Sequence, residues 1–147
     1  MRISAKKRLI TAVTALVIGL LLIWLFQLWQ QGSAVKNRNQ LYQELLERSG
    51  VLNRDLPKLL DEHTRFERAE VANYGMRFVY SLIGIDKYRN DVAGIQAQVE
   101  GPMQHHFCNS ESLAFYRNHA DFVEFRYLDM NDASLFTLRF TPADCIE

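Results

Sequence analysis

An uncharged stretch from Leu9 to Trp29 constrains this chain more than any other part of its sequence. Its only polar side chains are two threonines and one glutamine. As a helix rising about 1.5 Å per residue, it would be roughly 30 Å long, which matches the hydrocarbon thickness of a bilayer. Backbone groups in lipid must bond to one another, so an unbroken helix is expected. We therefore predict that residues 9–29 form a transmembrane helix in contact with the lipid bilayer.

The charges beside this stretch predict its orientation. Four basic residues and no acidic residue precede it, whereas the first charged residue after it is Lys36. A basic flank is retained on the cytoplasmic side of a membrane. We therefore expect a cytoplasmic basic tail at residues 1–8 and export of the chain beyond residue 29.

A cleaved secretory signal peptide is the alternative for this segment. The sequence Gly32-Ser33-Ala34 is an acceptable cleavage site. However, the apolar core of a signal peptide has about 7–15 residues, which is shorter than this stretch. Length therefore favours an uncleaved signal-anchor helix. A buried core helix is disfavoured because the stretch is not amphipathic.

The part of the chain beyond the predicted anchor is mildly acidic. The full sequence has 17 basic and 17 acidic residues, and its first 34 positions contain four of the basic residues and none of the acidic ones. The exported part therefore has 13 basic and 17 acidic residues, a net charge of −4. Such a balance gives no electrostatic footprint for nucleic acid. The length of this part suits one small domain.

Both cysteines, Cys108 and Cys145, fall in the exported part. Outside the cytoplasm, a pair of cysteines forms a disulfide more often than it remains as two thiols. Closing a loop of this length would stabilise a small domain by roughly 4 kcal/mol on the chain-entropy model. We therefore predict a disulfide between Cys108 and Cys145.

Residues 30–55 are expected to form a linker that includes a stalk helix. Leu41 and Leu45 recur at helical spacing in this segment, and Gly50 is expected to end the helix. The apolar stripe of the helix would serve self-association, contact with a partner, or packing against the chain's own domain. Packing is the favoured interpretation, because most such stripes face a core.

Residues 56–147 are expected to form an exported α+β domain. Four segments alternate apolar and polar residues, as half-buried strands do. They lie at residues 65–72, 76–83, 123–127 and 136–140. The sequence between the two strand pairs has helical spacing, with a break or kink expected at Gly101-Pro102. This order predicts a ββ-α-ββ domain, in which a four-stranded antiparallel sheet carries helices on one face.

Two histidines and a cysteine are the first candidates for chemistry. His105, His106 and Cys108 offer nitrogen and sulfur ligands to a soft metal ion. Adjacent helical residues point about 100° apart, so the two imidazoles would not easily share one ion. A disulfide would also remove the thiolate ligand. Surface histidines near a structural cysteine are therefore the favoured interpretation.

An acidic cluster with one imidazole is the second candidate. Its members are Asp61, Glu62, His63, Glu67 and Glu70. Paired carboxylates do acid–base work when burial separates their pKa values, but the interleaved arginines favour a solvated face. The sequence contains no phosphate-binding loop, nucleophile elbow, zinc-protease helix or calcium loop. We therefore assign no catalytic, cofactor-binding or metal-binding residue and expect no cofactor.

Several short motifs of the exported part occur together in a known group of proteins. These motifs are Leu56-Pro57-x-x-Leu60-Asp61-x-x-Thr64, Phe78-x-Tyr80, Phe125-Arg126-Tyr127 and Asp144-Cys145. Over residues 56–145 the chain resembles a group of small bacterial membrane-anchored or exported proteins with a C-terminal Cys…Cys α+β domain. A departure is the turn Met130-Asn131-Asp132, which lacks the glycine usual in such a hairpin. The resemblance implies the topology, the disulfide and a bacterial envelope location, and it implies no activity.

Together these features predict a single-pass protein of the bacterial inner membrane, with its N-terminus in the cytoplasm and its C-terminal domain in the periplasm. The leading hypothesis is a non-enzymatic module of the cell envelope that binds another protein, for which the edge of the last hairpin would be one docking site. One alternative is an immunity protein that neutralises a toxin in the periplasm. Another is a small metal-dependent or hydrolytic envelope enzyme that uses His105, His106 or the acidic cluster.

Overall fold

The computed structural model describes the backbone of residues 2–145 and the side chains of residues 16–27 and 37–145. Helix α1 spans Arg2–Asn53, and the chain divides into two compact units, residues 1–39 and 40–147. In the first unit, the large apolar side chains between residues 16 and 26 are at least half exposed.

The side chains of the predicted basic tail lie outside the described part of the chain, and those of the predicted transmembrane helix lie only partly within it. Residues 1–15 and 28–29 lie outside that part, so the transmembrane helix stays a prediction. Within the residues that the structure describes, no helix is long and apolar enough to cross a membrane.

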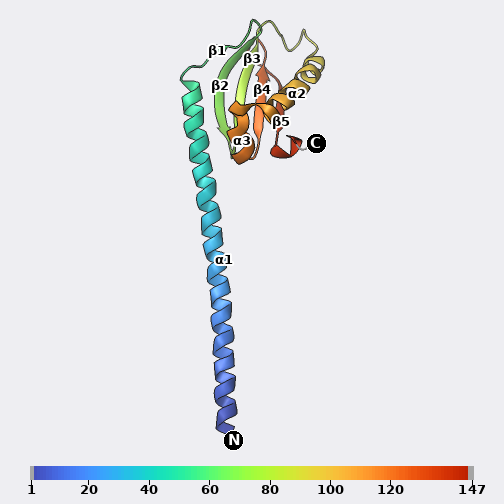
Figure 1. The fold of residues 1–147 in the computed structure, drawn as a ribbon. Coiled ribbons are helices and arrows are strands. Elements are labelled where there is room, and N and C mark those ends of the chain that lie inside the picture. Colours follow the sequence, from blue (N-terminus) through green and yellow to red (C-terminus); the bar gives the residue numbers. More distant parts are fainter. Residues whose placement is uncertain (1, 146–147) are drawn as a thin grey trace. The chain divides into compact units, whose positions relative to one another are not determined.

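The second unit is built on a five-stranded sheet in the order β1-β2-β3-β4-β5 (Figure 1). Its strands are β1 Lys58–Leu59, β2 Thr64–Ala72, β3 Gly75–Leu82, β4 Val123–Leu128 and β5 Ser134–Phe140. The four predicted strands are all present. The predicted number of strands is wrong, because β1 adds a two-residue edge strand that pairs with β2.

The predicted all-antiparallel arrangement is wrong at the centre of the sheet. The pairs β2–β3 and β4–β5 are antiparallel, but β3 and β4 run parallel, with Phe78 opposite Phe125. A parallel pair requires a crossover connection, and the helices between β3 and β4 provide it. They return the chain to the end of the sheet where β3 begins, so that Val123 lies opposite Met76.

The crossover forms a helical layer on one face of the sheet (Figure 1). Its elements are α2 Val92–Asn109, the 3-10 helix η1 Glu111–Leu113 and α3 Ala114–His119, and a short turn η2 Pro142–Cys145 follows β5. Helix α2 begins at Val92 because the Asp91 carboxylate accepts a hydrogen bond from the Gly94 N–H at 3.1 Å. The predicted α+β class and ββ-α-ββ order are thus confirmed.

Of the break or kink predicted at Gly101-Pro102, the break is wrong, because α2 continues through both residues. A proline inside a helix removes one backbone hydrogen bond and costs about 3 kcal/mol. Packing on both sides offsets this cost here, since Val99 and Met103 contact the core and Phe107 is fully buried. Tertiary contacts therefore override the local helix-breaking signal.

The last turns of α1, from Gln40 to Asn53, belong to the second unit and pack on its core. Leu45 is fully buried, and Leu41 of the same stripe contacts the core, as does Leu52 beyond it. The helix passes the predicted stop at Gly50 and ends at Asn53. The stripe thus packs on the chain's own domain, and the compact unit begins at Gln40, inside the segment 30–55 that was expected to be a linker.

Asn53 joins this helix end to the sheet. Its Nδ2 donates to the Ala69 carbonyl at 2.9 Å, and its Oδ1 accepts from the Ala69 N–H at 2.8 Å. Ser49 Oγ donates to the same carbonyl at 2.8 Å. Because β1 begins only at Lys58, opposite Phe66, it does not extend beside Ala69, and the Asn53 amide takes the place of a neighbouring strand.

Asn53→Ala is expected to lower the free energy of unfolding by about 2 kcal/mol, because the buried Ala69 N–H loses its acceptor and the carbonyl loses one of two donors. Equilibrium denaturation of the full chain measures this loss. Asn39→Ala, at an exposed position of the same helix, is the control and should change the value by less than about 0.5 kcal/mol. Equal stability of the two variants would contradict the role given to Asn53.

Candidate binding groove

A cavity of about 170 Å³ opens between the sheet, the helical layer and the end of α1. Aromatic side chains of β2, β3 and β4 form its floor. The residues that line it are Leu52, Phe66, Phe78, Tyr80, His106, Ser112, Leu113, Tyr116 and Phe125. All of them belong to the second compact unit.

The rings around the cavity pack against one another. The Phe66 centroid lies 4.9 Å from that of Tyr80 and 5.8 Å from that of Phe78. Tyr116 meets Phe78 edge-on at 5.5 Å, and such separations are favourable for aromatic pairs. Burial raises the pKa of Tyr80 and the pKa of Tyr116. Both hydroxyls therefore stay protonated at neutral pH, in the form that can donate a hydrogen bond to a ligand.

A larger cleft of about 660 Å³ adjoins the cavity along α1. The two share Leu52, Ser112 and Tyr116. The cleft is further lined by Glu44, Glu47, Arg48 and Val51. We call the cavity and the cleft together the aromatic groove. Its apolar floor can bury an apolar side chain of a ligand, and its rim offers polar groups for orientation.

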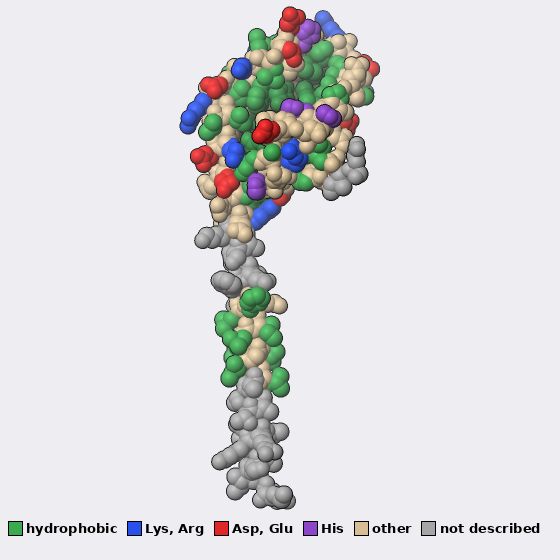
Figure 2. Space-filling view, viewed as in Figure 1, with side chains coloured by type: hydrophobic (Ala, Val, Ile, Leu, Met, Phe, Trp, Pro, Cys, Tyr) green, Lys and Arg blue, Asp and Glu red, His purple; other side chains and the backbone are tan. Residues whose placement is uncertain are grey.

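The exposed surface of the domain shows the same mixture of side chains. In Figure 2, hydrophobic side chains gather on the visible face among charged ones. The sequence indicated that Phe78, Tyr80 and Phe125 belong to the buried side of strands. It gave no sign of the opening above them, because that opening depends on how η1 and the end of α1 are placed.

The structure separates the two histidines that were considered as metal ligands. His106 lines the aromatic groove, whereas His105 lines a different cleft of about 530 Å³ beside the disulfide. Among the described residues, no group of three His, Cys, Asp or Glu side chains is placed to hold a metal ion.

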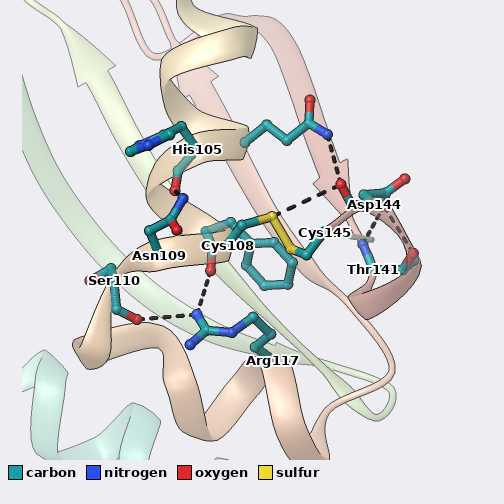
Figure 3. The surroundings of a disulfide bond; sticks show 10 residues. His105, Cys108, Asn109, Ser110, Arg117, Thr141, Asp144 and Cys145 are labelled. Atoms are coloured by element: carbon teal, nitrogen blue, oxygen red, sulfur yellow. Dashed lines mark hydrogen bonds between the residues drawn. A yellow bond between two sulfur atoms is a disulfide. The ribbon is translucent and has the colours of Figure 1, made fainter. Parts of the chain in front are cut away.

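Cys108 and Cys145 form the predicted disulfide, with their Cα atoms 5.3 Å apart (Figure 3). The bond ties the end of α2 to η2. Gln104 Nε2 donates to the Asp144 carbonyl at 2.9 Å across the same junction. Hydrogen bonds from the Thr141 N–H and hydroxyl hold the Asp144 side chain and lower its pKa. The C-terminal turn is thereby fixed to the helical layer.

The acidic cluster does not converge on one site. Asp61 precedes β2, whereas Glu67 and Glu70 lie along that strand. A hydrogen bond from the His63 N–H at 2.7 Å lowers the pKa of Asp61. Burial would raise the pKa of Glu67 and of Glu70, but hydrogen bonds and positive charge from neighbouring side chains outweigh it, so each pKa is lowered. Carboxylates held ionised in this way are poor proton donors at neutral pH.

The sheet face opposite the helical layer carries a row of alternating charges. Glu70, Arg77, Glu124 and Arg139 lie side by side on β2, β3, β4 and β5. Arg77 Nε is 2.7 Å from Glu124 Oε2, and the two outer pairs of the row are each 3.5 Å apart. The sequence indicated a charged strand face, but the pairing follows from the register, which alternation alone does not define.

No protein-family model and no curated protein sequence matches this chain. Solved structures do share its fold. A candidate secreted protein of Pseudomonas aeruginosa superposes with a TM-score of 0.65 at 12% identity, over 75% of this chain and 96% of that one.

Two pilotins are also similar in structure. The pilotin EpsS of the type 2 secretion system of Vibrio vulnificus superposes with a TM-score of 0.60 at 12% identity, over 76% of this chain and 97% of the pilotin. The type II secretion system pilotin AspS of Vibrio cholerae gives a TM-score of 0.60 at 12% identity, over 76% of this chain and 98% of the pilotin. At this level of identity, the likeness establishes a shared fold.

Proposed function

We propose that this chain is a non-enzymatic protein-binding module of the bacterial cell envelope. Two of the proteins that share its fold are pilotins of type II secretion systems, which supports a role in an envelope assembly. The disulfide suits an oxidising compartment outside the cytoplasm. The partner is another envelope protein.

In this proposal the chain is a single-pass protein of the inner membrane. Residues 9–29 are its signal-anchor helix, the N-terminus is cytoplasmic and the disulfide-bonded domain is periplasmic. The absence of charge over residues 9–29 and the basic residues before them support this topology.

The aromatic groove is the observation that carries the binding role. One large apolar side chain of a partner would fill the cavity, and buried anchors of this kind contribute much of the binding energy at protein interfaces. Glu44 and Glu47 on the rim of the cleft would attract basic residues beside the anchor. The expected ligand is therefore a protein segment with an apolar anchor flanked by lysine or arginine.

Ser112→Trp is expected to abolish partner binding, with at least tenfold less partner recovered than with the parent chain. Ser112 is exposed and lines both the cavity and the cleft, so an indole at this position would block the groove without disturbing the core. The measurement is crosslinking in intact cells, followed by affinity capture of the full chain from the membrane fraction and quantitative mass spectrometry.

Glu111→Trp is the matched control for this experiment. Glu111 belongs to the same 3-10 helix, is exposed and does not line the groove, so partner recovery should stay at the level of the parent. Equal recovery with Ser112→Trp would remove the groove as the binding site. Recovery of no reproducible partner would contradict the binding role, and a soluble chain lacking the first 34 residues would contradict the anchor.

A further inference from the structure

Among the arginines of the charged sheet face that lie outside the row of alternating charges, Arg126 differs from Arg65 and Arg68, which each pair with a glutamate. Arg126 of β4 lies between Val79 of β3 and Thr137 of β5 in the register. Among the described side chains, Arg126 forms no ion pair. Its Nε is buried and makes no hydrogen bond within the described part of the protein. Because that Nε is closed to solvent, an external acceptor reaches Arg126 through the terminal amino groups of its guanidinium, on the side that lines a neighbouring cleft.

The neighbouring carboxylates are already engaged with other groups. Glu67 accepts hydrogen bonds from Arg65 and from the Ser81 hydroxyl. Glu70 accepts from Arg68 at 2.5 Å. The carboxylate of Asp132, which lines the same cleft as Arg126, forms no ion pair with it either. None of these three carboxylates therefore occupies the Arg126 guanidinium.

A cleft of about 540 Å³ provides access to Arg126. It is lined by Arg65, Glu67, Arg68, Arg126, Leu128, Asp132 and Ser134. Three arginines and two acidic residues give this lining a formal charge of +1. One monovalent anion balances that charge, whereas a phosphate dianion would be repelled by Glu67 and Asp132.

We propose that this cleft binds a single carboxylate group through the guanidinium of Arg126. The planar fork of arginine pairs with the two oxygens of a carboxylate. The Ser134 hydroxyl supplies a further donor, and Leu128 supplies an apolar wall for the carbon atoms next to the carboxylate. The carboxylate belongs to an acidic side chain of a protein segment or to a small free carboxylic acid. The site lies on the sheet face opposite the aromatic groove and does not depend on the function proposed for that groove.

The experiment is an NMR titration of the full chain that follows the Nε–H resonance of Arg126. The probes are butyrate, its neutral analogue butyramide, inorganic phosphate, and two blocked pentapeptides with a central glutamate or glutamine between valines. We expect a saturable shift with butyrate or with the glutamate peptide, at a dissociation constant at least tenfold below that of its neutral counterpart. Tenfold preference for the glutamate peptide over butyrate identifies a protein segment as the source, and the reverse identifies a small acid.

Arg126→Lys keeps the charge but removes the fork, so binding should weaken at least fivefold. Arg89→Gln, at an exposed position in the loop before α2, is the control and should bind as the parent does. If neither butyrate nor the glutamate peptide shifts the Arg126 Nε–H resonance at probe concentrations up to 100 mM, the proposal is overturned. Tighter binding of phosphate than of butyrate would also overturn it, because the charge argument would then be wrong.

Discussion

Replacing Cys108 and Cys145 together by serine is expected to lower the free energy of unfolding by about 4 kcal/mol. The disulfide spans a sequence separation of 37 residues. Opening this loop returns conformational entropy to the unfolded chain, which makes unfolding more favourable. Equilibrium denaturation of the oxidised parent and of the double serine variant measures the difference.

The reduced parent chain is the control for this prediction. It has both thiols and lacks only the covalent link, so its stability should match that of the serine variant within about 1 kcal/mol. A denaturation midpoint that does not move when the parent is reduced would show that the disulfide contributes little to the fold.

Phe125→Ala is expected to lower the free energy of unfolding by about 4 kcal/mol. Phe125 is only 1% exposed, at the centre of the sheet. Its ring lies 5.7 Å from that of Phe78 and 6.0 Å from that of Phe140, measured between centroids. Truncation removes these contacts and leaves a cavity between neighbours that belong to separate strands and cannot fully close it. Chemical denaturation of the full chain provides the measurement.

Tyr88→Ala is the matched control, because it also removes an aromatic ring. Tyr88 is 89% exposed, so its replacement should change the free energy of unfolding by less than about 0.5 kcal/mol. If Phe125→Ala cost no more than Tyr88→Ala, the ring would not be part of a close-packed core, and the aromatic floor of the groove would have to be reconsidered.

Alternation along the chain made the four long strands predictable, because apolar side chains of one face pack in the core while polar and charged side chains dominate the other face. The strand β1 was missed for a physical reason, since two residues are too few to show a period. The parallel contact of β3 with β4 was missed because pairing across the crossover depends on packing of the helical layer, which no local pattern encodes. The groove and the pairing of Arg77 with Glu124 also depend on tertiary packing, so local patterns could not predict them.

The turn between β4 and β5 shows how a local signal can be replaced by side-chain chemistry. The sequence has no glycine there, and Asp132 instead adopts a left-handed conformation with φ 64°. The Asp129 carboxylate accepts hydrogen bonds from the N–H groups of Asn131 and Ala133 at 2.8 and 2.9 Å. These bonds close the turn without glycine.

The disulfide was predictable because the sequence contains only two cysteines, both beyond a long apolar stretch. That stretch indicates export to an oxidising compartment, where two cysteines pair with each other. The role of Asn53 was not predictable. An asparagine at a helix end is ordinary, and its use as a substitute for a strand requires that β1 stop short of Ala69. Function at Arg126 was equally hidden, because an arginine on a strand face is paired or unpaired according to its neighbours in the sheet.

The parallel contact between β3 and β4 has a consequence for how the domain assembles. Each antiparallel hairpin joins residues that are close in sequence, whereas Met76 meets Val123 only after the whole crossover has been traversed. Long-range contacts of this kind slow folding, because a large loop must close before they are gained. Until β3 pairs with β4, each of these strands has an unpaired edge that can form hydrogen bonds with another chain. Conditions that delay formation of the crossover should therefore lead to aggregation of partly folded chains in which both hairpins have already formed.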